Sequence, residues 1–279
     1  MNRTTDETVI ALFEPDRFRS TVPYYVAHRP RYPRGLLELV LAQVGLRQGA
    51  RVLDLGCGPG FLALGFAELG CKSIGIDPNA EMIAAACQAA DVAGLDVEFR
   101  LGSSYDLDAL SDRFDLAVMG RSFHWMDRAA TLISLDRIIA PGGAVVMFYD
   151  HHMRCSENAF ESVAEKVRET FGERNPIHSA RKSNKLLPDE ALFLDSHFSA
   201  LVRLGIVERR ALDADAIVGR AFSLSVTSPE MLGDRVLAFE SELRAGLAEL
   251  RPDGRFTEII EFNALIATRS TPVRGRCGR

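Results

Sequence analysis

Several features that define other classes of protein are missing from this sequence. Its 279 residues include five cysteines and one tryptophan, and no two cysteines form the C-x-x-C pair of a zinc or redox site. Their scattered spacing also argues against a disulfide framework. No apolar run approaches the roughly 20 residues that a membrane helix needs, because the best candidate, 36–46, is short and contains Glu38 and Gln43. We therefore expect no bound metal and no membrane span.

The charge balance lacks the basic excess of a general nucleic-acid-binding protein. The formal net charge is -5 at pH 7 and the pI is about 5.8, whereas neutralisation of phosphates needs clustered lysine and arginine. The first residues include acids and lack the apolar core of a secretory signal. We therefore expect a cytoplasmic monomer or homodimer with no nucleic-acid partner.

Strand and helix signals alternate through the first half of the chain. The hydrophobic share of 47% and the charged share of 25% are ordinary for a globular domain. The predicted strands are 51–55, 73–77, 96–101, 114–119 and 143–149, and the predicted helices are 35–44, 61–69, 79–91, 107–111 and 128–139. Five parallel strands with intervening helices make a doubly wound α/β sheet.

The pattern changes after Asp150. Residues 151–198 contain two helical stretches separated by a polar, basic loop and read as an insertion between strands five and six. Strand six is predicted at 201–209, helices follow at 213–223 and 229–250, and the last strand at 255–268. The basic tail, 269–279, has no apolar periodicity, and we expect it to be disordered.

The most informative segment is LDLGCGPG, residues 53–60. A buried strand leads into it and a helical pattern follows it. Gly56, Gly58 and Gly60 stand at alternate positions, where the backbone can take positive φ and approach a ligand without an intervening Cβ. A strand, a glycine turn and a helix in this order open a nucleotide-binding βαβ unit.

The ligand of this turn is indicated by two acidic residues. Asp77 ends the next predicted strand, where a carboxylate can accept hydrogen bonds from two ribose hydroxyls in dinucleotide and S-adenosylmethionine sites alike. However, the third glycine comes one residue earlier than in the dinucleotide pattern G-x-G-x-x-G. Asp54 also places a negative charge near the turn, which favours a cationic ligand over a diphosphate.

The segment resembles motif I of the class I S-adenosylmethionine-dependent methyltransferases, and Asp77 lies where that family has its ribose-binding acid. The resemblance implies a seven-stranded, mostly parallel Rossmann-like sheet with an antiparallel edge. It also implies S-adenosylmethionine as cofactor and S-adenosylhomocysteine as product. In this family the N-terminal segment, here 1–34, caps the donor site of the domain at 35–268, and an insertion such as 151–198 shapes the acceptor pocket.

A second resemblance lies before the glycine turn. The segment YYVAHRPRYP, residues 24–33, is similar to the Y-x-x-x-R-P-x-Y-P segment of the same enzymes. This implies that Tyr25 and Arg29 line the donor site, where an arginine suits the methionyl carboxylate by bidentate pairing. A solvated proline-rich turn is the alternative.

One family motif is not matched. After strand three the family has G-D-A, whereas this chain has Gly102, Ser103 and Ser104, although a serine hydroxyl can still accept from the adenine amino group. We expect Gly120 and Arg121 beside the methionyl group, and Met82 either on the adenine or in the core. The full set of expected cofactor-binding residues is Tyr25, Arg29, Asp54, Gly56, Gly58, Gly60, Asp77, Pro78, Met82, Ser103, Ser104, Gly120 and Arg121.

His124 is the candidate catalytic residue. Methyl transfer from a sulfonium is an in-line displacement in which the protein mostly positions and desolvates the reactants, so a base helps only when the acceptor must lose a proton. GRSFHWMD, residues 120–127, resembles the F-H-W-F/M-D segment of small-molecule methyltransferases similar to trans-aconitate and ubiquinone-pathway enzymes. A histidine, with an ordinary pKa near 6.5, can take that proton, or it can simply hydrogen-bond a loop or the donor carboxylate.

The sequence thus favours a methyltransferase that acts on an oxygen or nitrogen atom of a small molecule, with secondary metabolism as one setting and a carbon acceptor still open. A non-catalytic or partner-dependent protein that has kept the donor fold is the main alternative. An NAD(P)-dependent oxidoreductase is disfavoured by the glycine spacing, by Asp54 and by the lack of a Tyr-x-x-x-Lys pair.

Overall fold

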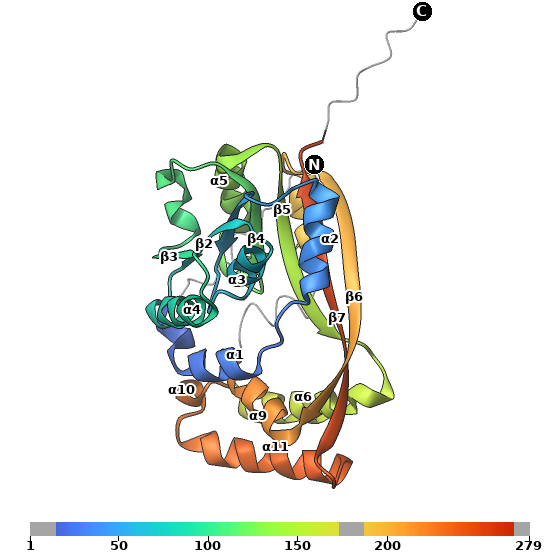
Figure 1. The fold of residues 1–279 in the computed structure, drawn as a ribbon. Helices are drawn as coiled ribbons and strands as arrows, with labels where there is room; N and C mark the ends of the chain where they lie inside the picture. The colour runs from blue at the N-terminus through green and yellow to red at the C-terminus, as the bar shows by residue number, and fades with distance from the viewer. Residues whose placement is uncertain (1–14, 173–186, 271–279) are drawn as a thin grey trace, which may run out of the picture.

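The computed structural model describes residues 15–172 and 187–270, which form one mixed sheet with helices on both faces (Figure 1). The strand order is β3-β2-β1-β4-β5-β7-β6, and β7 runs antiparallel to both its neighbours. The doubly wound, seven-stranded fold with an antiparallel edge is therefore confirmed.

The strands are β1 (Arg51–Leu55), β2 (Lys72–Asp77), β3 (Glu98–Leu101), β4 (Phe114–Gly120), β5 (Ile139–His152), β6 (Ala200–Asp213) and β7 (Arg255–Thr268). The α-helices are α1 (Val22–His28), α2 (Arg34–Val44), α3 (Phe61–Glu68), α4 (Ala80–Ala93), α5 (Arg128–Ile138), α6 (Ala159–Phe171), α8 (Asp189–Leu194), α9 (Ala214–Phe222), α10 (Pro229–Leu232) and α11 (Val236–Leu250). Short 3₁₀ segments include η2 (Pro15–Thr21), η3 (Ser104–Ala109) and η4 (Phe123–Trp125).

The central strands are buried on both faces, as expected for parallel strands covered by helices. In β1, Val52 faces the core that α2 and α3 complete, and the next residue, Leu53, faces the core that α5 and α8 complete. This alternation follows from the two-residue period of a strand. Because β1 pairs with β2 and β4 in parallel, the carboxyl ends of these strands lie at one edge of the sheet, where ligands bind in open α/β folds.

The structure differs from the predicted elements in several places, and the predicted helix 229–250 is divided at Gly233 into α10 and α11. Helix α1 is not among the predicted helices; none of its residues is fully buried, so its apolar pattern is weak. Residues 104–109 form a 3₁₀ turn in place of a helix at 107–111. Strand β5 extends beyond the predicted 143–149 at both ends. At its N-terminal end it includes Pro141 and Gly142, where its register with β4 shifts.

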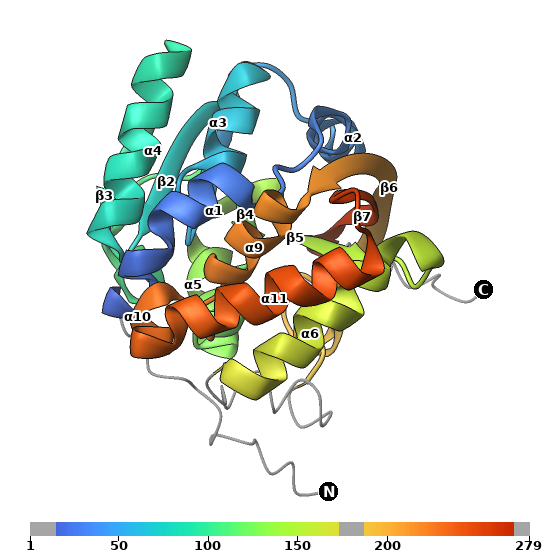
Figure 2. The ribbon, with the colours of Figure 1, turned by 90° about the horizontal axis from the view of Figure 1, so that it is seen from below.

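A third core lies beyond the carboxyl edge of the sheet. The β5–β7 pairing ends at His152 opposite Ile260, whereas the β6–β7 pairing continues to Asp213 opposite Arg255. Helices α9, α10 and α11 connect the projecting ends of β6 and β7 and pack with α6 around Phe239. Figure 2 shows these helices with α1 across the carboxyl edge, and we call α1, α6, α9, α10 and α11 the helical cap.

The predicted insertion is divided between two places. Helix α6 belongs to the helical cap, whereas Phe193 of α8 packs in the sheet core beside α5. The basic loop between them falls in 173–186 and lies outside the described residues, as does the tail from 271 onward. Arg269, at the start of the predicted tail, donates hydrogen bonds to Asp136 Oδ1 at 2.8 Å and to the Ala140 carbonyl at 3.0 Å.

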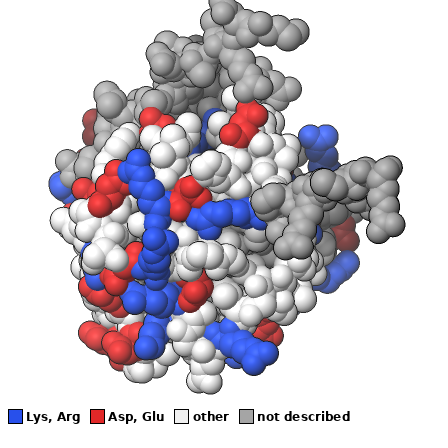
Figure 3. Space-filling view, turned by 90° about the horizontal axis from the view of Figure 1, so that it is seen from above, with Lys and Arg blue, Asp and Glu red and all other residues white. Residues whose placement is uncertain are grey.

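The surface charges are mixed. On the face shown in Figure 3, basic side chains form a row that is flanked by acidic side chains. Within the described residues, no helix is both long and apolar enough to cross a membrane.

Candidate functional site

The glycine turn after β1 is fastened to the end of β2. The backbone N–H groups of Gly56 and Cys57 donate to the Ile76 carbonyl at 2.7 and 3.0 Å. The N–H of Gly58 donates to Asp77 Oδ2 at 2.8 Å. The turn is therefore held by its neighbouring strand before any ligand is present.

The three glycines of the turn have different reasons to be glycine. Gly56, Gly58 and Gly60 all have positive φ, at 69°, 54° and 80°, which disfavours any side chain. A Cβ on Gly56 would lie 2.5 Å from the Ser122 Cβ, and one on Gly60 would lie 2.8 Å from Phe99 Cζ. A Cβ on Gly58 would meet only the Met82 sulfur, at 4.0 Å. Protein packing therefore excludes a side chain at the outer two positions, whereas Gly58 leaves space for a ligand.

Asp77 ends β2 with a carboxylate that is almost completely buried. Its Oδ2 accepts from Gly58 and its Oδ1 accepts from the N–H of Asn79 at 2.9 Å. Burial raises the pKa of Asp77, and these two backbone hydrogen bonds counteract the rise. Each oxygen keeps a further lone pair, so the carboxylate can still accept hydrogen bonds from two hydroxyls of a ligand.

Asp54 does not act as the fixed negative charge that the sequence suggested. It is 1% exposed, and its Oδ2 accepts from the N–H of Ala63 at 2.9 Å, in the first turn of α3. Burial raises its pKa to about 7; the Ala63 hydrogen bond lowers it and the nearby Asp77 raises it further. Its Oδ1 is buried and makes no hydrogen bond to the described protein atoms. The carboxyl group is thus partly protonated at neutral pH and has one acceptor atom left for a ligand.

A cleft of about 740 Å³, counting the space at its open mouth, lies at the carboxyl edge of the sheet. A smaller hollow of about 240 Å³ adjoins it and is lined by Asp54, Tyr32 and Phe61. The predicted residues that line the main cleft are Tyr25, Gly56, Gly58, Asp77, Pro78, Met82, Ser103, Ser104, Gly120 and Arg121. A ligand the size of a nucleoside with a side chain fits such a space.

Three predicted residues do not line the main cleft: Arg29 and Gly60 line neither space, and Asp54 lines only the smaller one. Arg29 lies 5.2 Å above the ring of Tyr25, and its Nε is buried with no hydrogen-bond partner in the described structure. Burial lowers the pKa of Arg29. Gly60 is the N-cap residue before α3 and serves the fold of the turn.

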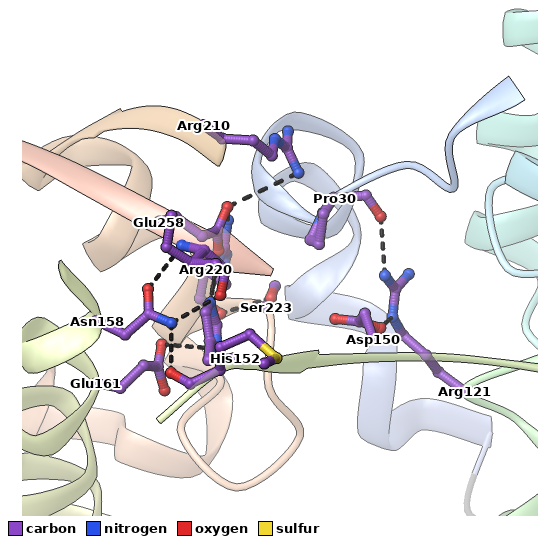
Figure 4. A network of polar contacts seen from close by, with 12 residues as sticks. Pro30, Arg121, Asp150, His152, Asn158, Glu161, Arg210, Arg220, Ser223 and Glu258 are labelled. Atoms are coloured by element: carbon purple, nitrogen blue, oxygen red, sulfur yellow. Dashed lines mark hydrogen bonds and ion pairs between the residues drawn. The ribbon is translucent and has the colours of Figure 1, made fainter. Parts of the chain in front are cut away.

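Arg121 links the end of β4 to the N-terminal segment. It has a positive φ of 60°, which is uncommon outside glycine. Its guanidinium pairs with Asp150 and donates to the Pro30 carbonyl at 2.8 Å (Figure 4). It also lies 4.7 Å above the Tyr32 ring. Although burial disfavours its charge, Asp150 and Tyr32 raise the pKa of Arg121 well above its ordinary value. The guanidinium of Arg121 therefore has partners within the protein. Through the Pro30 carbonyl it holds the segment that follows Tyr25 against the end of β4.

Sequence reasoning missed part of the cleft wall. The additional lining residues are Phe18, Asn79, Tyr105, Ser122, Trp125 and Met126. Ser122 was detectable only in three dimensions, because it donates to the Leu55 carbonyl at 2.8 Å across the sheet. Local patterns, by contrast, can be read from the sequence. The capping box of Ser103 and Asp106, for example, follows the S-x-x-D spacing.

His124 lies in η4 beside the cleft and is half-buried. Its ring centre is 5.0 Å from that of Trp125, and Trp125 packs edge-on against Phe18 at 5.4 Å. Trp125 lines the cleft, whereas His124 is not among the lining residues. The structure thus places the candidate base one residue away from the cleft wall.

Comparisons with known proteins relate part of the chain to methyltransferases. Residues 52–143 match the family model of the methyltransferase domain. The ubiquinone biosynthesis O-methyltransferase of Cereibacter sphaeroides is 36% identical over 100 residues, which are 36% of this chain and 40% of that protein. The chain thus spans about 40% of the length of this relative.

Two solved structures share the fold. A chain assigned as a type II methyltransferase of Anaeromyxobacter dehalogenans superposes with a TM-score of 0.61 at 19% identity, covering 86% of this chain and 97% of that one. An S-adenosylmethionine-dependent methyltransferase of Geobacter sulfurreducens in complex with S-adenosylhomocysteine gives a TM-score of 0.52 at 20% identity, covering 93% and 100%.

The fold and the glycine turn define a nucleoside-binding α/β domain. Residues 52–143 match the methyltransferase domain model, and the fold of the sheet is shared with the two solved methyltransferases.

The buried Asp54 carboxyl predicts a pH-dependent stability. Because its folded pKa of about 7 exceeds its unfolded value, the folded state holds more protons between these values, and the free energy of unfolding falls as pH rises toward 7. For one proton, the free energy of unfolding can fall by at most about 1.4 kcal/mol per pH unit. Asp54→Asn removes this ionisation, so the variant should gain stability relative to the wild type from pH 4 to 7 in urea unfolding. A difference between the two proteins that is constant with pH would contradict this.

Proposed function

We propose that the protein transfers a methyl group from S-adenosylmethionine to a small-molecule acceptor. The observation that carries this proposal is the pairing of Gly58 with Asp77. The backbone there leaves room for a ligand, and a buried carboxylate with free lone pairs lies beside that room. A ribose with two neighbouring hydroxyls suits such a carboxylate.

The residues around the cleft suit the parts of the donor. Asp77 would hold the ribose hydroxyls, and Met82 and Pro78 would pack on the adenine, with Ser103 and Ser104 near its polar edge. The smaller hollow suits the methionyl end, because the unpartnered Asp54 Oδ1 can accept from an ammonium group. Arg29, with a buried Nε that makes no hydrogen bond, is proposed to bind the methionyl carboxylate after a change of side-chain position.

When bound, the donor supplies an electrophilic methyl group on a sulfonium. In the transfer, the bond from sulfur to methyl carbon breaks and a bond from the acceptor atom to that carbon forms, which leaves S-adenosylhomocysteine. Trp125, Phe18 and Met126 line the cleft with apolar surface, and exclusion of water from the reacting atoms is the main contribution expected of them. An O–H or N–H acceptor must also lose a proton.

We propose an oxygen or nitrogen acceptor, and the O-methyltransferase activity named for the relatives favours oxygen. His124 is the proposed base. Because its neighbour Trp125 lines the cleft, we propose that His124 acts on the acceptor after a rotation of its side chain or through one water. A setting in secondary metabolism stays a prediction, since the relatives are named for ubiquinone biosynthesis.

The role of Asp77 is tested by Asp77→Ala. Loss of a charged hydrogen-bond acceptor costs about 1.5–3 kcal/mol, so S-adenosylhomocysteine should bind about 10- to 100-fold more weakly by calorimetry. Asp108→Ala is the matched control, because Asp108 lies exposed on η3 and pairs with Arg137. Equal affinities of the two folded variants would contradict the role given to Asp77.

The role of His124 is tested once a screen with labelled donor has found an acceptor. If His124 takes the acceptor proton, His124→Ala should lower kcat by about 10²- to 10⁴-fold. It should also remove the fall of kcat at low pH, and the affinity for S-adenosylhomocysteine should stay unchanged. His197→Ala, a change at an exposed histidine paired with Asp136, should leave both unaltered. An unchanged kcat for His124→Ala would exclude the base.

A further inference from the structure

A second group of buried charges lies under the helical cap and outside the donor cleft. Its centre is Glu258 on the projecting part of β7, with a side chain that is fully buried. Arg220 of α9 pairs with both of its oxygens, and His152 Nε2 lies 2.5 Å from its Oε1. Arg210 is directly opposite on β6, with its Nη1 3.8 Å from Glu258 Oε2 (Figure 4). Two guanidinium groups therefore flank one carboxylate.

The arginines of this region have donors that the protein does not use. Among the described residues, five buried side-chain nitrogen or oxygen atoms make no hydrogen bond, and three of these are Arg210 Nη1, Arg220 Nε and Arg29 Nε. Buried donors in folded proteins are nearly always paired. Arg29 is already assigned to the methionyl carboxylate of the donor, so the orphaned nitrogens of Arg210 and Arg220 are the ones that indicate a further hydrogen-bond acceptor in this region.

The charges of the region are also unequal. Four arginines, Arg29, Arg121, Arg210 and Arg220, face two carboxylates, Asp150 and Glu258. Burial raises the pKa of Asp150, but the surrounding Arg121, Arg29 and Arg220 hold it below its ordinary value. Glu161 lies at the margin, where it pairs with His152 and Arg168. The methionyl end of a donor carries one carboxylate and one ammonium, so its binding would leave the cationic excess in place.

The position of this region relates it to the cleft. Strand β5 connects the two, since Asp150 holds Arg121 at the cleft and His152, two residues on, contacts Glu258. Figure 4 shows these two polar groups on either side of β5's end. A molecule bound beside Arg210 and Arg220 would therefore lie between the sheet edge and the helical cap, where an acceptor can extend toward the donor.

We propose that the acceptor carries an anionic oxygen group, a carboxylate or a phosphate, and that Arg210 and Arg220 bind it under the helical cap. This rests on the proposed function and narrows its substrate class. The planar guanidinium suits such groups because it donates two parallel hydrogen bonds. Glu258 orients both guanidiniums, and their remaining donors hold the ligand.

The test uses the full chain saturated with S-adenosylhomocysteine. Succinate and inorganic phosphate are titrated separately by calorimetry, with chloride added to keep the ionic strength constant. The wild type should bind at least one of them with a saturable isotherm, and the better probe identifies carboxylate or phosphate. Arg210→Gln should weaken that binding at least tenfold.

A neighbouring residue gives a matched control. Arg209→Gln makes the same charge change on the same strand, at a side chain that is 69% exposed and pairs with Glu157, and it should bind the probe like the wild type. Arg220→Lys keeps the charge facing Glu258 but loses the paired N–H donors of the guanidinium, so it should also weaken probe binding. It serves as the second variant if Arg210→Gln does not fold.

Two results would overturn the inference: no saturable binding of either probe by the wild type, or equal weakening by Arg209→Gln and Arg210→Gln, which would show a nonspecific charge effect. Binding of S-adenosylhomocysteine is measured first on every protein. If the wild type does not bind S-adenosylhomocysteine, the proposed function is contradicted. If it binds S-adenosylhomocysteine but neither anion, only the proposal of an anionic acceptor is contradicted.

Discussion

The site depends on the attachment of the glycine turn to the end of β2. Ile76 and Asp77 accept three N–H groups from Gly56, Cys57 and Gly58, so the positive φ angles of the turn are held by the sheet. The same Asp77 carboxylate faces the cleft with lone pairs to spare. One side chain therefore both shapes the turn and offers the contact that selects a ribose, which is why a change at Asp77 affects the backbone as well as the ligand.

The helical cap gives the site its second wall. Helix α1 packs on α9, where a Cβ on Gly219 would lie 2.1 Å from the His28 ring, and it carries Tyr25 over the glycine turn. Below it, the long β6–β7 hairpin brings Arg210 and Glu258 past the end of β5. A buried donor without a hydrogen-bond partner is costly, so the unpaired nitrogens of Arg210 and Arg220 favour a ligand with negative charge.

Much of this arrangement could be predicted from local sequence. The glycine turn, Asp77 and the alternation of strands and helices follow from short-range patterns, and the last strand begins and ends as predicted. Contacts between distant segments could not be predicted. The approach of Ser122 to Gly56 depends on the register of β4 beside β1, and the raised pKa of Asp54 depends on burial that a sequence does not display. The helical cap was missed as a unit because its helices come from three separated segments.

The central claim is that the turn selects S-adenosylmethionine and its product rather than a dinucleotide. Calorimetric titration of the wild-type chain with S-adenosylhomocysteine and, separately, with NAD tests this most directly. The account predicts one molecule of S-adenosylhomocysteine bound per chain with micromolar affinity and no heat of binding for NAD. Binding of NAD without binding of S-adenosylhomocysteine would contradict it.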